Sequence, residues 1–277
     1  QKPGEPGWDS PWGKGRPGWH IECSVMAMKY LGETIDIHGG GPDLIFPHHE
    51  NEIAQSEAAT GKPFARYFMH VGYLNINNQK MSKSLGNFFT VRDILKVYDP
   101  ETVRFFMLSS HYRSPINFSE ELIQQAANAL ERFYNALYAM EHLESSAKDK
   151  DLTAPCKEYL KKLELNRQEF IRAMDDDFNT ADAIASLFNI VRDYNMNIDE
   201  ESPKKLITDT KNALLSLGDV LGFFRKFKEK TLLDEEIEKK IQEGQKAREA
   251  ITKRRHQCIY IHGYRTHRYH PHVYSHG

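Results

Sequence analysis

The spacing of apolar residues divides the chain into an α/β part and a helical part. Apolar residues recur at helical spacing over 19–31, and the run 34–38 predicts a strand that ends in the turn 39–43. A helix should follow, and 67–74 predicts a second strand. Strand, glycine-rich turn and helix in this order indicate a parallel α/β sheet.

Beyond residue 90 the apolar periodicity is helical throughout, and we expect no further strand. Thr90 should cap a helix over 91–97, and Ser119 should cap a long helix with an apolar stripe from Leu122 to Met140. Three further apolar stripes predict helices over 156–174, 181–195 and 204–224. These helices should form a small bundle, because each stripe needs a partner.

The pair His48 and Glu52 has the spacing of two side chains on one helix face, one turn apart. Pro47 suits the first turn of that helix, and His49 should be turned about 100° away from the shared face. Cys23 would add a thiolate, and thiolate, imidazole and carboxylate together are typical of a zinc site. Taken singly, Cys23 is also compatible with a buried apolar cysteine, and His48 with a hydrogen-bonded core histidine.

Composition places the chain among ordinary soluble proteins. Of its 277 residues 40% are hydrophobic and 27% charged, the net charge is −2, and no apolar run could cross a bilayer. The polar start, rich in Pro and Gly, does not resemble a signal or transit peptide. The three cysteines (Cys23, Cys156, Cys258) do not form a disulfide framework, which fits a reducing compartment. From these features together we expect a cytoplasmic protein without a membrane partner.

Two lysines, Lys80 and Lys83, lie three residues apart in a short polar segment. Mobile ammonium groups there are suited to a phosphate chain whose charge grows as a bond breaks. A solvated turn is the better interpretation of a generic Lys-x-x-Lys. The full string Lys80-Met81-Ser82-Lys83-Ser84 arises by chance in a chain of this length only about once in ten thousand.

That pentamer is the KMSKS motif of class I aminoacyl-tRNA synthetases. With the segments 15–24, 36–52 and 83–88, the chain resembles the cysteinyl-tRNA synthetase family. The resemblance runs from about residue 4 to 114, resumes at 176–180 and fades after 247–250. It implies that Cys23, His48 and Glu52 match three of the family's four zinc ligands, with the metal selecting the cysteine thiol.

The resemblance also implies the reaction and its partners. Cysteine, ATP and tRNA(Cys) would be the substrates, Mg²⁺ would accompany ATP, and a cysteinyl-adenylate would be the intermediate. Lys83 would hold the phosphates with help from Lys80. Asp43 follows a strand and would bind the ATP ribose, or else cap a helix. Trp19 would line the cysteine pocket, or else be a buried packing residue.

The implied fold is α/β followed by all-α, the carboxyl-terminal half of a Rossmann-like class I catalytic domain and then helical domains. We expect a partial catalytic domain over 1–95, a helical stem-contact region over 96–145, a DALR-like bundle over 146–230 and a charged helix with a tail over 231–277. The tail from 256, with six of the thirteen histidines, should be disordered or an out-of-frame readout rather than a metal site.

The chain also departs from the family. It contains no His-x-Gly-His and no cysteine before Cys23, so we expect a fragment that is inactive alone. The resemblance implies a monomer. Two alternatives stay open: the cysteine ligase of mycothiol synthesis, and a non-catalytic remnant that binds zinc or tRNA.

Overall fold

A computed structural model describes residues 3–77, 79–80 and 90–227, together with 236, 239, 240, 242, 243 and 246. The chain divides into two compact units, 1–223 and 224–277. The tail from 256 and the end of the predicted charged helix lie outside the described residues.

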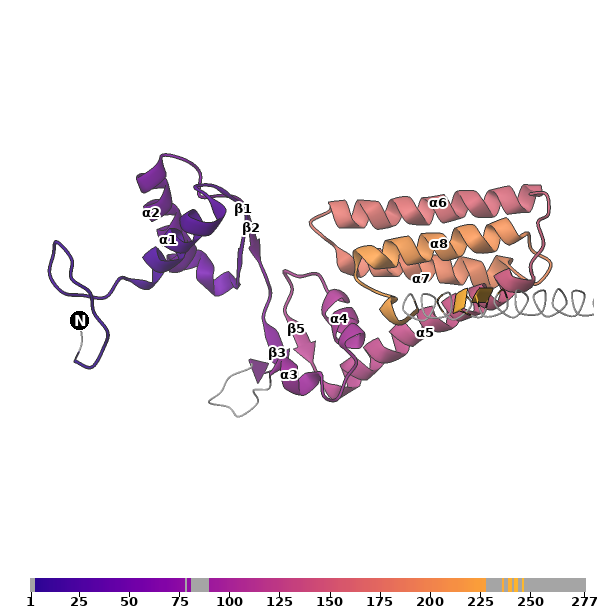
Figure 1. Ribbon diagram of the computed structural model, residues 1–277, viewed down its shortest axis with the longest axis horizontal. Helices are drawn as coiled ribbons and strands as arrows, with labels where there is room; N and C mark the ends of the chain where they lie inside the picture. The colour runs from indigo at the N-terminus through magenta and orange to yellow at the C-terminus, as the bar shows by residue number, and fades with distance from the viewer. Residues whose placement is uncertain are drawn as a thin grey trace, which may run out of the picture. The chain divides into compact units, whose positions relative to one another are not determined.

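The amino-terminal part is an α/β arrangement, as the periodicity predicted. Its helices are α1 (Trp19–Leu31) and α2 (Glu50–Thr60), and its strands are β1 (Ile35–Gly40) and β2 (Ala65–His70). Between β1 and α2 lie two short turns, the 3₁₀ turn η1 (Pro42–Leu44) and the π-type turn η2 (Ile45–His49). The strands β1 and β2 pair in parallel, with Ile35 opposite Ala65 and Gly40 opposite His70. Helix α1 packs against α2 beside this sheet (Figure 1). The connection through α2 is the crossover that parallel strands require.

The helix that carries Glu52 begins later than expected. The π-type turn Ile45–His49 consists of two helical segments joined across a kink at Phe46, and the regular α-helix α2 starts at Glu50. Phe46 has extended dihedral angles (φ −135°, ψ 133°), and the Phe46–Pro47 peptide is cis. Proline disfavours helical angles in the residue before it, which explains the break at Phe46.

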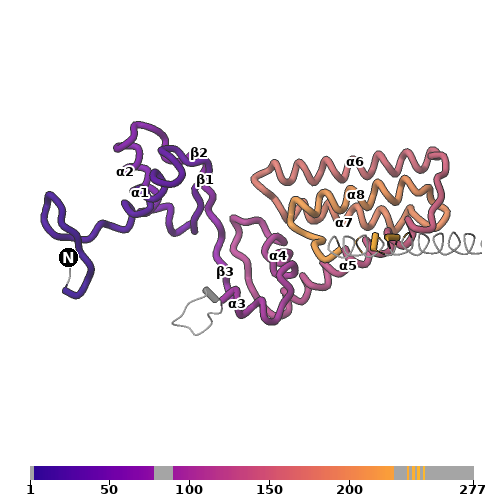
Figure 2. The backbone as a smooth tube through the Cα atoms, in the orientation of Figure 1, coloured from indigo at the N-terminus to yellow at the C-terminus, as the bar shows by residue number. Residues whose placement is uncertain are grey.

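A second sheet corrects the expectation that strands end before residue 90. It has the order β4-β3-β5, with β3 at Leu74–Ile76, β4 at Gln79–Lys80 and β5 at Ile116–Phe118. Strand β5 pairs in parallel with β3, and β4 pairs antiparallel with β3. Figure 2 shows β3 following β2 along the backbone. Three residues are too few to display a strand period, so this pairing depends on contacts distant in sequence.

The predicted strand over 67–74 is in fact the end of β2 and the start of β3, separated at Gly72. The backbone approaches so closely here that a Cβ on Gly72 would lie 2.3 Å from the Ser114 carbonyl oxygen. Gly72 N–H donates to the Tyr112 carbonyl at 2.7 Å. Glycine therefore lets the chain pass directly against the segment that leads into β5.

The predicted caps at Thr90 and Ser119 are confirmed. Thr90 forms a capping box with Asp93 at the start of α3 (Val91–Ile94), and Ser119 accepts from the Leu122 N–H at the start of α5 (Glu120–Ser146). Between them lies α4 (Pro100–Leu108). The buried face of α5 is the apolar stripe that the sequence predicted, with Ile123, Ala126, Leu130, Phe133, Leu137 and Met140 inside.

The predicted bundle is present in α6 (Ala154–Asp175), α7 (Thr180–Asn197) and α8 (Lys204–Val220), which lie side by side (Figure 1). Its interior is apolar apart from paired polar groups, such as Tyr159 Oη with Thr210 Oγ1 at 2.8 Å. Burial raises the pKa of Tyr159 to about 12, so its hydroxyl stays neutral. In the part of the chain that the structure describes, no helix has the length and apolar character of a membrane span.

Candidate metal centre

Side chains from two segments that are distant in sequence meet between the first two helices. Cys23 lies on α1, His48 in the π-type turn and Glu52 on α2. The packing of α1 against α2 brings one ligand atom of each within 4.8 Å of the others. His48 Nε2 is 3.4 Å from Glu52 Oε1. Ligand atoms about 2.1 Å from a tetrahedral ion lie roughly 3.4 Å apart, so this pair already has the separation that zinc requires.

The two oxygens of Glu52 differ in their surroundings. The side chain is fully buried, and Oε2 is 2.8 Å from His38 Nε2. Oε1 has no hydrogen-bond partner among the described residues, and His48 Nε2 is 3.4 Å from it. A buried carboxylate oxygen without a partner is costly. A cation between Glu52, His48 and Cys23 would satisfy Oε1, so these residues fit a metal ion.

The ring of His48 is held from two sides. His48 Nδ1 is 2.7 Å from His20 Nδ1, which leaves Nε2 directed toward Glu52. The Trp19 ring stacks on the His48 ring with centroids 4.2 Å apart and planes at 20°. Trp19 is nevertheless 59% exposed, so the interpretation of a buried packing tryptophan is wrong. A fixed ring orientation is typical of a metal-ligating histidine.

A second group of possible ligands shares Glu52. His38, His49 and Glu52 also present ligand atoms within 4.8 Å of one another. The expectation that His49 is turned away from the metal-facing side does not hold, because His49 has α-helical dihedral angles and residues three apart, such as His49 and Glu52, are also neighbours on a helix. His49 Nδ1 is 3.0 Å from His70 Nε2. Burial and the nearby His38 lower the pKa of His49, which favours a neutral ring.

The thiol of Cys23 is in a setting that favours its protonated form when no cation is near. Burial raises the pKa of Cys23, and the negative charges of Glu52 and Glu22 raise it further. A cation at the centre would offset all three effects, because it stabilises the thiolate. Among the described residues, Cys23 and Cys156 are both free thiols, and Cys156 lies on α6, outside this cluster.

Asp43 caps no helix. It lies inside η1, whose N-cap is Gly41, and the N-cap of α2 is His49, so the helix-cap alternative is wrong. The Asp43 carboxylate hydrogen-bonds Tyr73, and the pKa of Tyr73 is raised by desolvation and by that carboxylate. Asp43 is exposed, beyond the carboxyl end of β1. Its contact with the ATP ribose stays a prediction.

The two predicted lysines are described unequally. Lys80 ends β4, where its backbone pairs with Asn75 of β3. Lys83 lies outside the described residues, and so does the rest of the motif after Lys80.

The sequence did not indicate that His38 and His70 belong to this cluster. Together with His20 and His49 they hydrogen-bond or stack within it. A signal was available, because His38 and His70 fall near the carboxyl ends of the two strands, where parallel sheets gather polar side chains. The contacts of His20 and His49 depend on helix packing and on the π-type turn.

Comparisons with known proteins agree with this architecture. Residues 1–128 match the family model described as tRNA synthetases class I (C) catalytic domain. Residues 169–225 match the DALR domain. A solved structure, the ternary complex of Agrobacterium radiobacter K84 agnB2 LeuRS with tRNA and LeuAMS, superposes with a TM-score of 0.61 at 16% identity. It covers 76% of this chain, and this chain spans 32% of its length. The predicted fold class, α/β followed by a helical domain, is thereby confirmed.

Proposed function

We propose that this chain serves in joining cysteine to tRNA(Cys), because residues 1–128 match the class I aminoacyl-tRNA synthetase catalytic domain and residues 169–225 match the DALR domain. Cys23, His48 and Glu52 would hold one Zn²⁺ that selects the cysteine thiol. The observation that carries this proposal is the buried Glu52 Oε1, which lacks a hydrogen-bond partner and lies beside a thiol and an imidazole.

The chemistry of this donor set supports cysteine as the amino acid. Thiolate, imidazole and carboxylate suit zinc rather than Mg²⁺ or Ca²⁺. A bound zinc ion would supply a position that takes a thiolate, which serine cannot match with its hydroxyl. Trp19, stacked on His48 and exposed on its other face, would line the pocket of the substrate side chain.

The remaining predicted roles concern ATP. In adenylation the cysteine carboxylate attacks the α-phosphorus, and the bond to the pyrophosphate oxygen breaks. Lys80 and Lys83 would hold the phosphates as charge builds on the leaving pyrophosphate, with Mg²⁺ accompanying ATP. Asp43 would accept hydrogen bonds from the ribose. Pyrophosphate leaves in this first step. A hydroxyl of the terminal tRNA ribose then attacks the carbonyl carbon of the adenylate, and the anhydride bond to AMP breaks.

Cobalt absorption tests the metal centre directly, because a thiolate ligand of Co²⁺ gives a charge-transfer band that histidine ligands do not. In the full chain carrying Cys258→Ser, only Cys23 and Cys156 remain as thiols. We expect this band in the parent and in Cys156→Ser, and its loss in Cys23→Ser. A band that survives Cys23→Ser would remove Cys23 from the site.

The same sample tests the selection of the amino acid. Adding L-cysteine should strengthen the charge-transfer band, since a second thiolate reaches the metal, whereas L-serine should leave it unchanged. An equal response to both amino acids would contradict cysteine selection while leaving the metal site intact.

A further inference from the structure

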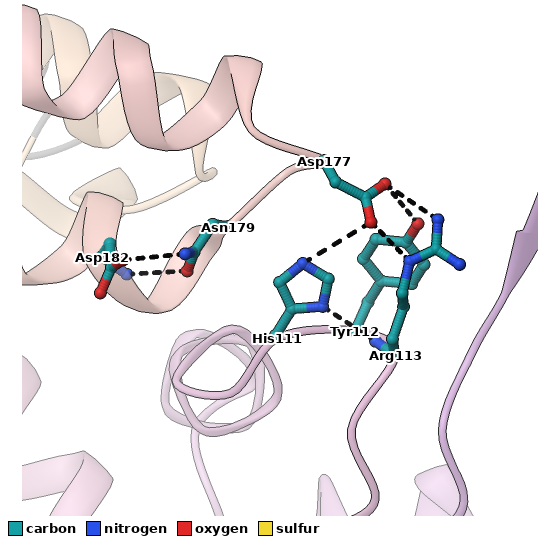
Figure 3. A network of polar contacts seen from close by, with 6 residues as sticks. All are labelled: His111, Tyr112, Arg113, Asp177, Asn179 and Asp182. Carbon is teal, nitrogen blue, oxygen red and sulfur yellow. Dashed lines mark hydrogen bonds and ion pairs between the residues drawn. The ribbon is translucent and has the colours of Figure 1, made fainter.

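Asp177 joins the corner between α6 and α7 to the segment between α4 and β5 (Figure 3). Its Oδ1 accepts hydrogen bonds from Tyr112 Oη at 2.7 Å and Arg113 Nη2 at 3.2 Å, and its Oδ2 accepts one from Arg113 Nε at 2.5 Å. His111 Nε2 lies 3.9 Å from Oδ2. A carboxylate that accepts hydrogen bonds from two N–H groups of one guanidinium and from a phenol hydroxyl is fixed in orientation as well as in position.

The charge state of this network is constant over the physiological range. The hydrogen bonds from Arg113 and then Tyr112 lower the pKa of Asp177 to about 2. The hydrogen bond to Asp177 likewise raises the pKa of Arg113. Asp177 is 42% exposed, so the ion pair of Asp177 and Arg113 is in contact with water. What distinguishes this pair from ordinary surface ion pairs is its geometry and not its burial.

The backbone at Asp177 is held in an uncommon conformation. Asp177 and Phe178 both have positive φ, 54° and 56°, which residues other than glycine rarely adopt twice in succession. Thr180 begins α7, and its hydroxyl donates to the Leu108 carbonyl at the end of α4 at 2.7 Å. Two independent contacts therefore fix this corner to the α4–β5 segment, and surroundings that impose such angles often serve function.

The α4–β5 segment is in turn bonded to the strands that lead to Lys80. The Tyr112 carbonyl accepts from Gly72 N–H at 2.7 Å, and the Tyr73 carbonyl accepts from Ile116 N–H at 2.9 Å. Strand β5 then pairs with β3 along its whole length, and β3 pairs with β4, where Asn75 lies opposite Lys80. An unbroken series of hydrogen bonds thus connects Asp177 with the backbone of Lys80.

We propose that Asp177 is a positioning residue: by holding Tyr112 and Arg113 it sets the place of β5, β3 and β4, and so couples the helical bundle to the strand that carries Lys80. The benefit of this coupling to adenylation rests on the proposed function. The coupling itself is a property of the fold, and it is measurable without substrate.

Hydrogen exchange of the full chain, followed by mass spectrometry, tests the coupling. In Asp177→Ala we expect amides of 71–77 and 112–118 to exchange about fivefold faster, because β3 and β5 lose a fixed anchor. The matched control is Glu201→Ala, which removes an exposed carboxylate that Lys150 Nζ contacts at 2.7 Å within the bundle part. The control should leave both peptides unchanged.

Faster exchange confined to 174–182 would overturn the proposal, since Asp177 would then stabilise only its own corner. If Asp177→Ala does not fold, Asp177→Asn retains an acceptor for Tyr112 and should accelerate the same two peptides to a smaller extent. No acceleration of 71–77 in a folded Asp177→Asn would equally overturn it. Adding Arg113→Ala to Asp177→Ala should cause little further change, because both act through one contact.

This outcome is independent of the metal experiment. Loss of cobalt binding with intact coupling would contradict the proposed function alone, and loss of coupling with intact cobalt binding would contradict only the role of Asp177.

Discussion

At the scale of single residues, the buried carboxylate of Glu52 is the decisive group. One of its oxygens is 2.8 Å from His38 Nε2, and the other faces Cys23 and His48 without a hydrogen bond. A ring N–H from His38 would hold the carboxylate plane and keep the second oxygen directed at the two other ligands. His38 should therefore affect the metal without contacting it.

Replacing His38 should weaken metal binding rather than abolish it. We expect His38→Ala to lower the affinity for Co²⁺ by about 10- to 100-fold, the usual cost of losing a residue that orients a ligand. Titration of the thiolate band measures this affinity. His142→Ala, an exposed histidine on α5, is the matched control and should bind as the parent does. Unchanged affinity in His38→Ala would contradict the orienting role.

The low pKa of Asp177 predicts how its contribution depends on pH. Its pKa is about 2 in the folded chain and about 3.9 when unfolded, so its ionised contacts favour folding fully above about pH 4. That contribution is lost as the pH falls through 2. The difference in urea midpoint between the parent and Asp177→Asn should thus be constant from pH 5 to 7 and shrink below about pH 4. A difference that grows on acidification would contradict this sign.

At the scale of elements, the close approach at Gly72 determines how β3 and β5 meet. The Ser114 carbonyl oxygen and carbon and the Pro115 nitrogen all lie within 3.0 Å of where a Cβ would be. They are backbone atoms, so no side-chain rotation can relieve the overlap. Any side chain at position 72 must separate the two strands.

Gly72→Ala should accordingly destabilise the fold by about 1–3 kcal/mol, the usual cost of forcing atoms into a filled space. Urea unfolding at fixed pH measures the change. Gly15→Ala is the control, because nothing lies within 4 Å of its Cβ position, and it should change stability by less than about 0.5 kcal/mol. Equal effects of the two substitutions would contradict the steric argument.

The elements differ in how far their sequences predicted them. The predicted helix over 19–31 matches α1, and the caps at Thr90 and Ser119 are where they were expected, because apolar periodicity and capping chemistry are local signals. The π-type turn and β5 were not predictable in this way. The first follows from Phe46 adopting extended angles before Pro47, and the second exists through its pairing with β3.

At the scale of the whole first unit, helix α5 packs against two groups of helices. One group is α4, and the other is α7 with α8. Phe133, which is fully buried, is in contact with both groups: its ring centroid is 6.3 Å from that of Phe105 on α4 and 4.2 Å from that of Phe188 on α7. The second pair is stacked at 28°. One side chain thus stabilises the helices on either side of α5.

Replacing Phe133 by alanine should destabilise the packing of α5 against α4 and against α7 together. We expect Phe133→Ala to cost about 3–5 kcal/mol and to increase hydrogen exchange in α4 and in α7 alike. Leu165→Ala, at a position 64% exposed on α6, should change neither. Increased exchange in α7 alone would show that the α4 contact is independent of the bundle.

Sequence and structure contribute differently to the candidate sites. Cys23, His48 and Glu52 were recognisable because motif spacing and ligand chemistry coincide, and the fold brings them together. The contacts of Asp177 with Tyr112 and Arg113 were not foreseen, although both segments lie in regions of family resemblance. A carboxylate and a guanidinium more than sixty positions apart carry no local signal of pairing.

The parallel pairing of β3 with β5 has a consequence for how such chains can evolve. The Lys80–Lys83 segment lies within the connection from Ile76 to Ile116, and both ends of that connection are held by strand hydrogen bonds. The same connection contains α3 and α4, and Phe105 and Phe106 of α4 are buried, so most of it cannot change length without disturbing the core. Insertions should be tolerated in its exposed turn at 95–97, where they would leave the register of β3 and β5 unchanged.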